Sequence, residues 1–126
     1  MDRKLVSSGS PYEAAIGYSR AVRDGRHVCV AGTCAVMPDG GEPPRDAYGQ
    51  AKRCLEIIEA ALVEAGASLA DVVRTRIYVT DPALIDEVGR AHAEAFADVR
   101  PACTGVVVQL LDPRWLVELE VDALLP

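Results

Sequence analysis

The ten residues from Asp71 to Thr80, DVVRTRIYVT, decide the architecture of this chain. Two sets of side chains alternate along them. One set is small or apolar and comprises Val73, Thr75, Ile77 and Val79. The other is longer and polar and comprises Arg74, Arg76 and Tyr78. An alternation of period two predicts a strand with one buried face, and such a strand needs a cover on that face.

The segments on either side of this strand have helical spacing. Before it, Asp46 is suited to cap a helix that ends just ahead of Gly66, and after it Asp81-Pro82 is a typical helix start. The first apolar stripe comprises Ala47, Ala51, Leu55, Ile58, Leu62 and Ala65. The second comprises Leu84, Ile85, Val88, Ala91, Ala95 and Phe96, which predicts a helix to about Ala97.

The rest of the chain predicts further strands. Residues 18–34 indicate a hairpin with a type I′ turn at Asp24-Gly25, followed by a Pro- and Gly-rich loop at 37–46. A strand is expected from Pro101 through Leu111, then a turn at Asp112-Pro113. In the last segment one face comprises Trp115, Val117, Leu119, Val121 and Ala123. This alternation predicts a closing strand.

These elements predict an α+β fold in which residues 1–126 form one domain, with two helices on one face of a mixed sheet. The other face carries the positive strand at 74–78 and the acidic side chains of Glu118, Glu120 and Asp122. Opposite charges pair if the two strands are neighbours. This face is either solvated or a subunit interface. We favour an interface because Val106, Val108 and Leu110 add aliphatic side chains beside it.

Composition narrows the classes of partner. A net charge of −6 and a pI near 4.8 disfavour nucleic acid, and no apolar run approaches the ~20 residues of a membrane span. The first residues lack the apolar core of a signal peptide, so we expect a soluble cytoplasmic protein. The four cysteines form no C-x-x-C pair and predict reduced, structural thiols with no metal site.

Six stretches in order resemble the RidA/YjgF family of reactive-intermediate deaminases. They are GYSRAV…DGRHVCVAG, the long helix after the Pro/Gly loop, DVVRTRIYVTD, AHAEAF, RPACTGV and LVELEVDA. The resemblance implies a chorismate-mutase-like fold of order β-β-β-α-β-α-β-β. It also implies a homotrimer with three small-molecule clefts between subunits. The residues that it places in the cleft are Tyr18, Ala31, Gly32, Gly89, Cys103, Thr104 and Glu118, the last as the group that holds the attacking water.

Cys103 departs most clearly from the family pattern. In deaminating members the stretch that resembles RPACTGV reads Pro-Ala-Arg, and that arginine holds the carboxylate of a 2-imino acid. A thiol offers one weak donor where a guanidinium offers a charged fork, so the archetypal substrate should bind poorly. Gly89 and Ala31 stand where asparagine and serine are common, which removes two further polar groups.

Other readings of these residues remain open. Cys103 is either a small filler or a nucleophile with His92 as its base, and a metal set of Cys103, His92 and Glu118 is conceivable. Glu118 and Glu120 either act in acid/base chemistry or pair with strand arginines, and Tyr18 either covers a ligand or packs. Arg100 is either a surface residue or a substitute for the missing guanidinium.

Two functions follow as hypotheses. In the first, the protein hydrolyses an imine or enamine that lacks the usual carboxylate, a reaction that needs positioning and Glu118 but no cofactor or metal. In the second, the same trimer is a non-catalytic module that binds or senses a metabolite. Ribonuclease action is disfavoured by the acidic charge and by the absence of a suitable histidine pair.

Overall fold

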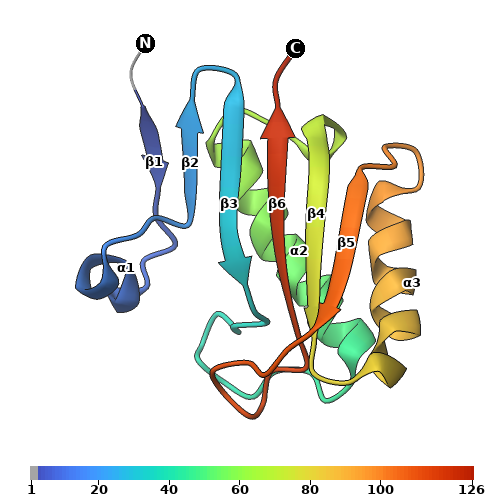
Figure 1. The fold of residues 1–126 in the computed structure, drawn as a ribbon. Helices are drawn as coiled ribbons and strands as arrows, with labels where there is room; N and C mark the ends of the chain where they lie inside the picture. Colours follow the sequence, from blue (N-terminus) through green and yellow to red (C-terminus); the bar gives the residue numbers. More distant parts are fainter. Residues whose placement is uncertain (1–2) are drawn as a thin grey trace.

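A six-stranded mixed sheet organises the computed structural model, which describes residues 3–126 (Figure 1). The strands are β1 (Lys4–Val6), β2 (Ala21–Asp24), β3 (His27–Thr33), β4 (Val72–Val79), β5 (Ala102–Val107) and β6 (Val117–Leu124). The helices are α1 (Pro11–Ile16), α2 (Ala47–Glu64) and α3 (Ile85–Phe96), with short 3₁₀ turns at Leu69–Asp71 and Pro82–Leu84.

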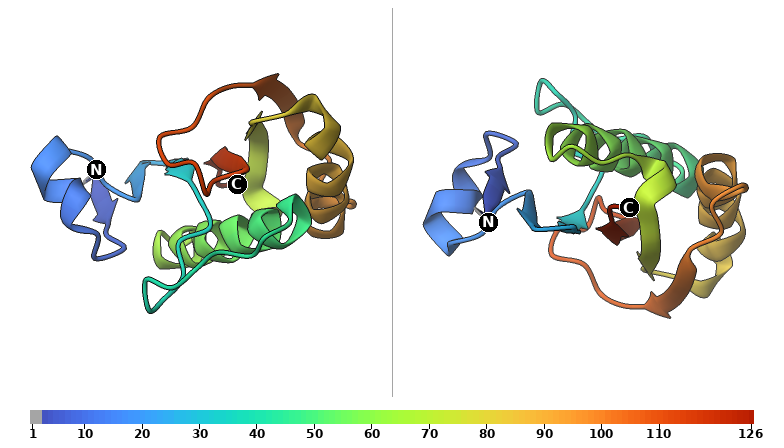
Figure 2. Two further views of the ribbon diagram at one scale, coloured as in Figure 1. Left: turned by 90° about the horizontal axis from the view of Figure 1, so that it is seen from below. Right: turned by 90° about the horizontal axis from the view of Figure 1, so that it is seen from above.

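The spatial order of the strands is β1-β2-β3-β6-β4-β5, so the chain terminates in the middle of the sheet. The pair β4/β5 is parallel because α3 crosses between these strands, and the other neighbours are antiparallel. Both α2 and α3 cover the same face, as the two views along the sheet show (Figure 2). The predicted α+β class is confirmed, and so is the element order β-β-β-α-β-α-β-β that the resemblance implied, with the short helix α1 added between the first two strands.

Helix α2 begins and ends where its sequence indicates. The Asp46 side chain accepts a hydrogen bond from the Gly49 amide, and Gly66, at φ 89°, takes the left-handed conformation that follows the last turn. Its apolar stripe is buried against the sheet, where Val28, Leu119 and Val121 are at most 2% exposed. Apolar burial between α2 and this face therefore forms the core.

A β-bulge corrects the prediction for the strand that opened the sequence analysis. Val72 pairs with Ala123 and Arg74 with Asp122, so Val73 is an extra residue without a partner on β6. The buried residue is Val72, whereas Val73 is 49% exposed. The predicted alternation holds from Arg74 onward, since the bulge shifts the pattern by one residue only at the start of β4.

Two other predictions differ from the structure, and one helix was missed. The hairpin turn is Gly25-Arg26, with Asp24 paired to His27, and its positive φ at Gly25 alone fits a type II′ turn better than type I′. Strand β5 ends at Val107 instead of Leu111, because its partner β4 ends at Val79 in the same register. Helix α1, capped by Ser10 and Pro11, was not predicted.

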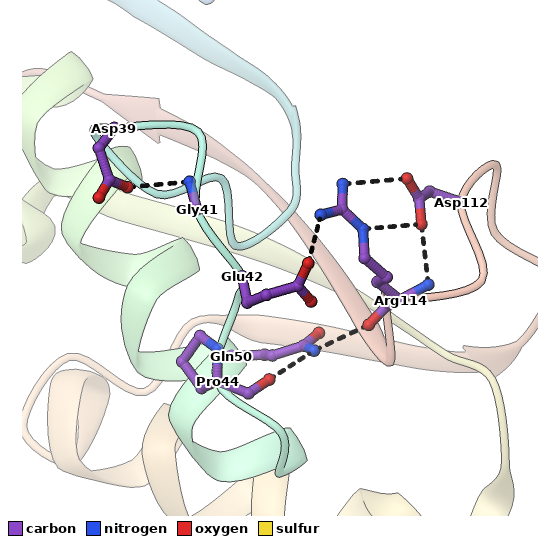
Figure 3. Close-up of polar contacts among 7 residues, drawn as sticks. All are labelled: Asp39, Gly41, Glu42, Pro44, Gln50, Asp112 and Arg114. Atoms are coloured by element: carbon purple, nitrogen blue, oxygen red, sulfur yellow. Dashed lines mark hydrogen bonds and ion pairs between the residues drawn. The ribbon is translucent and has the colours of Figure 1, made fainter.

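The Pro/Gly loop and the loop after β5 are tied to α2 by one buried glutamine (Figure 3). Gln50 Nε2 donates to the carbonyls of Pro44 and Arg114, both at 2.9 Å, and its Oε1 accepts from the Leu116 amide at 2.9 Å. Arg114 adds an ion pair to Glu42 across the same two loops and a second one to Asp112 within its own loop. These contacts fix the end of the sheet at which β6 begins.

Candidate functional site

The face of the sheet opposite α2 and α3, called the open face below, carries a ladder of charged pairs. Arg76 Nη1 lies 3.2 Å from Asp122 Oδ2 and 3.9 Å from Glu120 Oε2. The Tyr78 hydroxyl donates to Glu120, and this bond to a carboxylate raises the pKa of Tyr78. The predicted pairing of the two strands is confirmed, and it engages Glu120 and Asp122 but not Glu118.

Glu118 lies on β6 against the bulge of β3. A Cβ placed on Gly32 would lie 3.1 Å from the Glu118 carboxyl carbon and 3.2 Å from Oε2, so the missing side chain makes room for this carboxylate. The Cys34 thiol donates to Glu118 Oε1 at 3.4 Å. Burial and the charge of Glu118 raise the pKa of Cys34, so this thiol stays a neutral donor.

Tyr18 and Ala31 line a hollow of about 610 Å³ on the same face. Its other lining residues are Leu5, Glu13, Gly17, Ser19, Val22, Cys29, Val30, Glu120 and Asp122. The buried Glu13 carboxylate lies at the edge of the hollow and accepts hydrogen bonds from Ser8 and Ser7, which lower its pKa. We call Tyr18, Ala31, Gly32 and Glu118 the β3 wall.

Gly89, Cys103 and Thr104 form a second group, called the β5 wall, at the opposite edge of the sheet. Cys103 is in register with Thr75, whose hydroxyl bonds to His92 of α3, so Cys103 points toward the helix side. Thr104 is in register with Arg76 and points to the open face. A Cβ on Gly89 would meet no atom within 4 Å, which leaves open space on α3.

The two walls do not meet within one chain. Strands β6 and β4 lie between β3 and β5, so about 14 Å separates Gly32 on β3 from β5, and about 10 Å separates Glu118 on β6 from β5. Glu118 also lies on the open face, whereas Cys103 points toward the helix side. The structure therefore gathers the predicted residues into two half-sites instead of one cleft.

The geometry does not support Cys103 as a nucleophile with His92 as its base, or as a metal ligand. The half-buried His92 ring has a lowered pKa because of its burial, and it bonds Thr75 at 2.8 Å; across residues 3–126 no hydrogen bond joins it to Cys103. The described residues also contain no group of three or more histidine, cysteine or acidic side chains placed to hold a metal ion.

Of the three cysteines predicted to be structural, Cys54 fits best. Its side chain is fully buried on α2, and burial raises its pKa to about 12. Cys34 is half-buried beside Glu118, and Cys29 is exposed on the open face, where it lines the hollow. Cys29 corrects the prediction because β3 alternates, and its odd positions at this point face away from α2.

Arg20 was missed in the sequence, although it precedes β2 beside Tyr18. Its Nη1 donates to Gly32 O at 3.0 Å and to Thr33 Oγ1 at 2.7 Å, and its guanidinium lies 5.8 Å from the Tyr18 ring centroid. Arg100, the arginine considered earlier, instead follows the end of α3 at φ 54° and donates its amide to Phe96 O. No signal in the sequence separated Arg20 from the other arginines.

Comparison with known proteins adds a family to this geometry. Residues 9–125 match the family model described as endoribonuclease L-PSP. An uncharacterised protein of Streptomyces coelicolor is 43% identical over 121 residues, which cover 95% of this chain and 90% of that protein. A protein of Escherichia coli with the provisional name reactive intermediate deaminase TdcF is 33% identical, over 97% of this chain and 95% of that one.

Solved structures agree with the sequence matches. Rv2704 from Mycobacterium tuberculosis, described as a member of the YjgF/YER057c/UK114 family, superimposes with a TM-score of 0.90 at 50% identity. The match covers 98% of this chain and all of that one.

Within the described residues, no helix is long and apolar enough to cross a membrane.

Proposed function

Because the chain belongs to the RidA/YjgF family, we propose that it is a homotrimer that binds a small molecule in clefts between subunits and hydrolyses an imine or enamine there. The observation that carries the proposal is the separation of the β3 wall from the β5 wall. One chain cannot close a cleft around both, so a second copy must supply the missing wall. The trimer and its clefts are therefore part of the proposal.

Glu118 is the group that we assign to the chemistry. Its carboxylate is half-buried, accepts one weak bond from Cys34, and faces the space left by Gly32. A water held there adds to the imine carbon, and Glu118 takes one of its protons and passes it to the nitrogen, which gives a carbinolamine. As the C–N bond breaks, Glu118 moves the hydroxyl proton of the carbinolamine to the nitrogen, so that the carbonyl forms and ammonia leaves. The products are a carbonyl compound and ammonia, so atoms and charge balance without a further reactant.

The β5 wall selects the substrate. Cys103 is exposed and bonds to no charged side chain among residues 3–126, and a Cβ on Gly89 would meet open space. Replacing a forked cation by a thiol removes a contact worth on the order of 2 to 5 kcal/mol to a desolvated carboxylate. We therefore propose that the substrate is not the archetypal 2-imino acid, whose carboxylate needs an arginine at this position.

The test compares wild-type protein with Cys103→Arg on 2-iminobutanoate generated in situ. We expect the arginine variant to gain at least about tenfold in kcat/KM, since a bidentate charged contact is restored, while Cys103→Ser gains nothing.

Glu118→Gln should abolish turnover of any imine. A wild-type rate equal to that of Cys103→Arg would contradict the assignment, and light scattering that shows a monomer would contradict the shared cleft.

The second candidate is a binding module without catalysis. The loss of polar groups at Ala31, Gly89 and Cys103 favours it, because these changes leave room but remove donors. It predicts that a metabolite raises the Tm while no imine is turned over by either wild type or Cys103→Arg. Turnover in the wild type excludes this candidate.

A further inference from the structure

Arg20 is held in place by the β3 wall. Its Nη1 donates to Gly32 O at 3.0 Å and to Thr33 Oγ1 at 2.7 Å, and Thr33 is only 1% exposed. Thr33 Oγ1 in turn donates to Ala31 O at 2.8 Å, which ties the arginine to the bulge of β3. One end of the guanidinium is therefore fixed beside the residues that we assign to the cleft.

The other donors of Arg20 have no acceptor. Its Nε is buried and is the one buried side-chain nitrogen or oxygen in residues 3–126 that lacks a hydrogen-bond partner. Its Nη2 makes no hydrogen bond to the described residues, and no carboxylate among them lies within 4.0 Å. Nε and Nη2 form one edge of the planar fork, the edge suited to a carboxylate.

The nearby carboxylates are engaged elsewhere. Glu13 accepts from Ser7 and Ser8, while Glu120 and Asp122 are bound by Arg76 and Tyr78. Among the described residues, Glu118 accepts only from the Cys34 thiol. Within residues 3–126, Arg20 and Glu118 thus both lie beside Gly32 without an ion-pair partner, and they are more than 4.0 Å apart.

We propose that Arg20 binds an acidic group of the ligand, and that this group is several bonds away from the carbon that is attacked. The inference rests on the proposed function, because it takes the reacting carbon to lie over Glu118. The proposed mechanism places a water between Glu118 and that carbon, and Arg20 is bonded to Gly32 O more than 4.0 Å from the Glu118 carboxylate, so the acid group belongs several bonds from the reacting carbon. Because Nε is buried, the guanidinium has to turn about its bonded Nη1 end to reach the acid, which then accepts from both Nε and Nη2.

Two isomeric keto acids test this, since a ketone is the product of imine hydrolysis. 4-Oxopentanoate carries its carboxylate away from the carbonyl, 2-oxopentanoate carries it on the adjacent carbon, and 2-pentanone has none. We expect calorimetric titration of the wild-type assembly to show 4-oxopentanoate binding about tenfold more tightly than either of the others, as a forked cation to a carboxylate allows. Arg20→Gln should remove that preference, and Arg45→Gln, at an exposed loop arginine, should keep it.

Arg20→Lys guards against a folding defect in the glutamine variant. It keeps the charge but loses the fork, so the preference for 4-oxopentanoate should fall to an intermediate value. Equal affinity for the two isomers in the wild type, or an unchanged preference in Arg20→Gln and Arg20→Lys, would overturn the inference. The Glu118→Gln variant separates the two proposals. It should lose imine turnover, which tests catalysis, and keep the preference for 4-oxopentanoate, which tests binding by Arg20.

Discussion

The two faces of the sheet differ in how they are stabilised. On the face covered by α2 and α3, Val28, Val30, Leu119 and Val121 are at most 2% exposed, and apolar burial supplies the stability. On the open face, Arg76, Glu120 and Asp122 form a half-exposed ladder of the kind that contributes little energy. The difference shows that apolar burial stabilises the sheet from the covered face, whereas the open face carries its charged side chains.

Among the variants that test this difference between the faces, Leu119→Ala should destabilise the protein most. Leu119 is 2% exposed and lies on the covered face of β6, so truncation leaves a cavity and should lower the free energy of unfolding by about 2 to 5 kcal/mol. Leu124→Ala is the control on the same strand, because Leu124 is 37% exposed. Urea denaturation measures both. A loss of similar size in the two variants would show that the covered face is not the main source of stability.

Gln50→Leu tests the buried polar side chain that joins the two loops to α2 on the covered side. The substitution keeps the volume but leaves the Pro44 and Arg114 carbonyls and the Leu116 amide without their partner, at a cost of about 1 to 3 kcal/mol. Gln109→Leu changes the other glutamine, which is exposed, and should cost little. Thermal unfolding compares them. Unchanged stability in Gln50→Leu would mean that the two loops hold their positions without this tether.

Glu13→Gln gives the smallest effect and depends on pH. Hydrogen bonds from Ser7 and Ser8 lower the pKa of Glu13 below its ordinary 4.5, so its contribution is present above that value and is lost as pH falls through the folded-state pKa. We expect the variant to be less stable by about 1 kcal/mol at pH 7 and the difference to shrink below pH 4.5.

Denaturation curves at pH 7, 5 and 3.5 check this prediction, with Glu59→Gln on the exposed side of α2 as the control. If the difference in stability between wild type and Glu13→Gln stays constant over this range, Glu13 stabilises the fold through its shape and not through its charge.

Much of the fold was readable from local patterns. The Asp46 cap, the stripe of α2, the alternation of β6 and the charge pairing between β4 and β6 were all predicted, because each depends on neighbours in the sequence or on a single strand pair. The errors lie where a neighbour in space intervenes. The bulge at Val73 depends on the register with β6, and the end of β5 depends on the end of β4.

The candidate site divides in the same way. The residue types at Cys103, Gly89 and Glu118 were visible in the sequence, and the family resemblance predicted from them a cleft with altered polarity. Their distribution over two walls was not visible, because strand order separates β3 from β5. The role of Arg20 was also hidden, since an arginine without a carboxylate partner looks like any other until its surroundings are known.

By itself, then, the sequence determined the elements and the side-chain chemistry, since periodicity and residue type are local properties of the chain. Only the tertiary structure decided which of those side chains meet, because register, strand order and burial arise from contacts between distant segments. For this protein that difference separates knowing that Glu118 and Cys103 are present from knowing that one chain cannot bring them together.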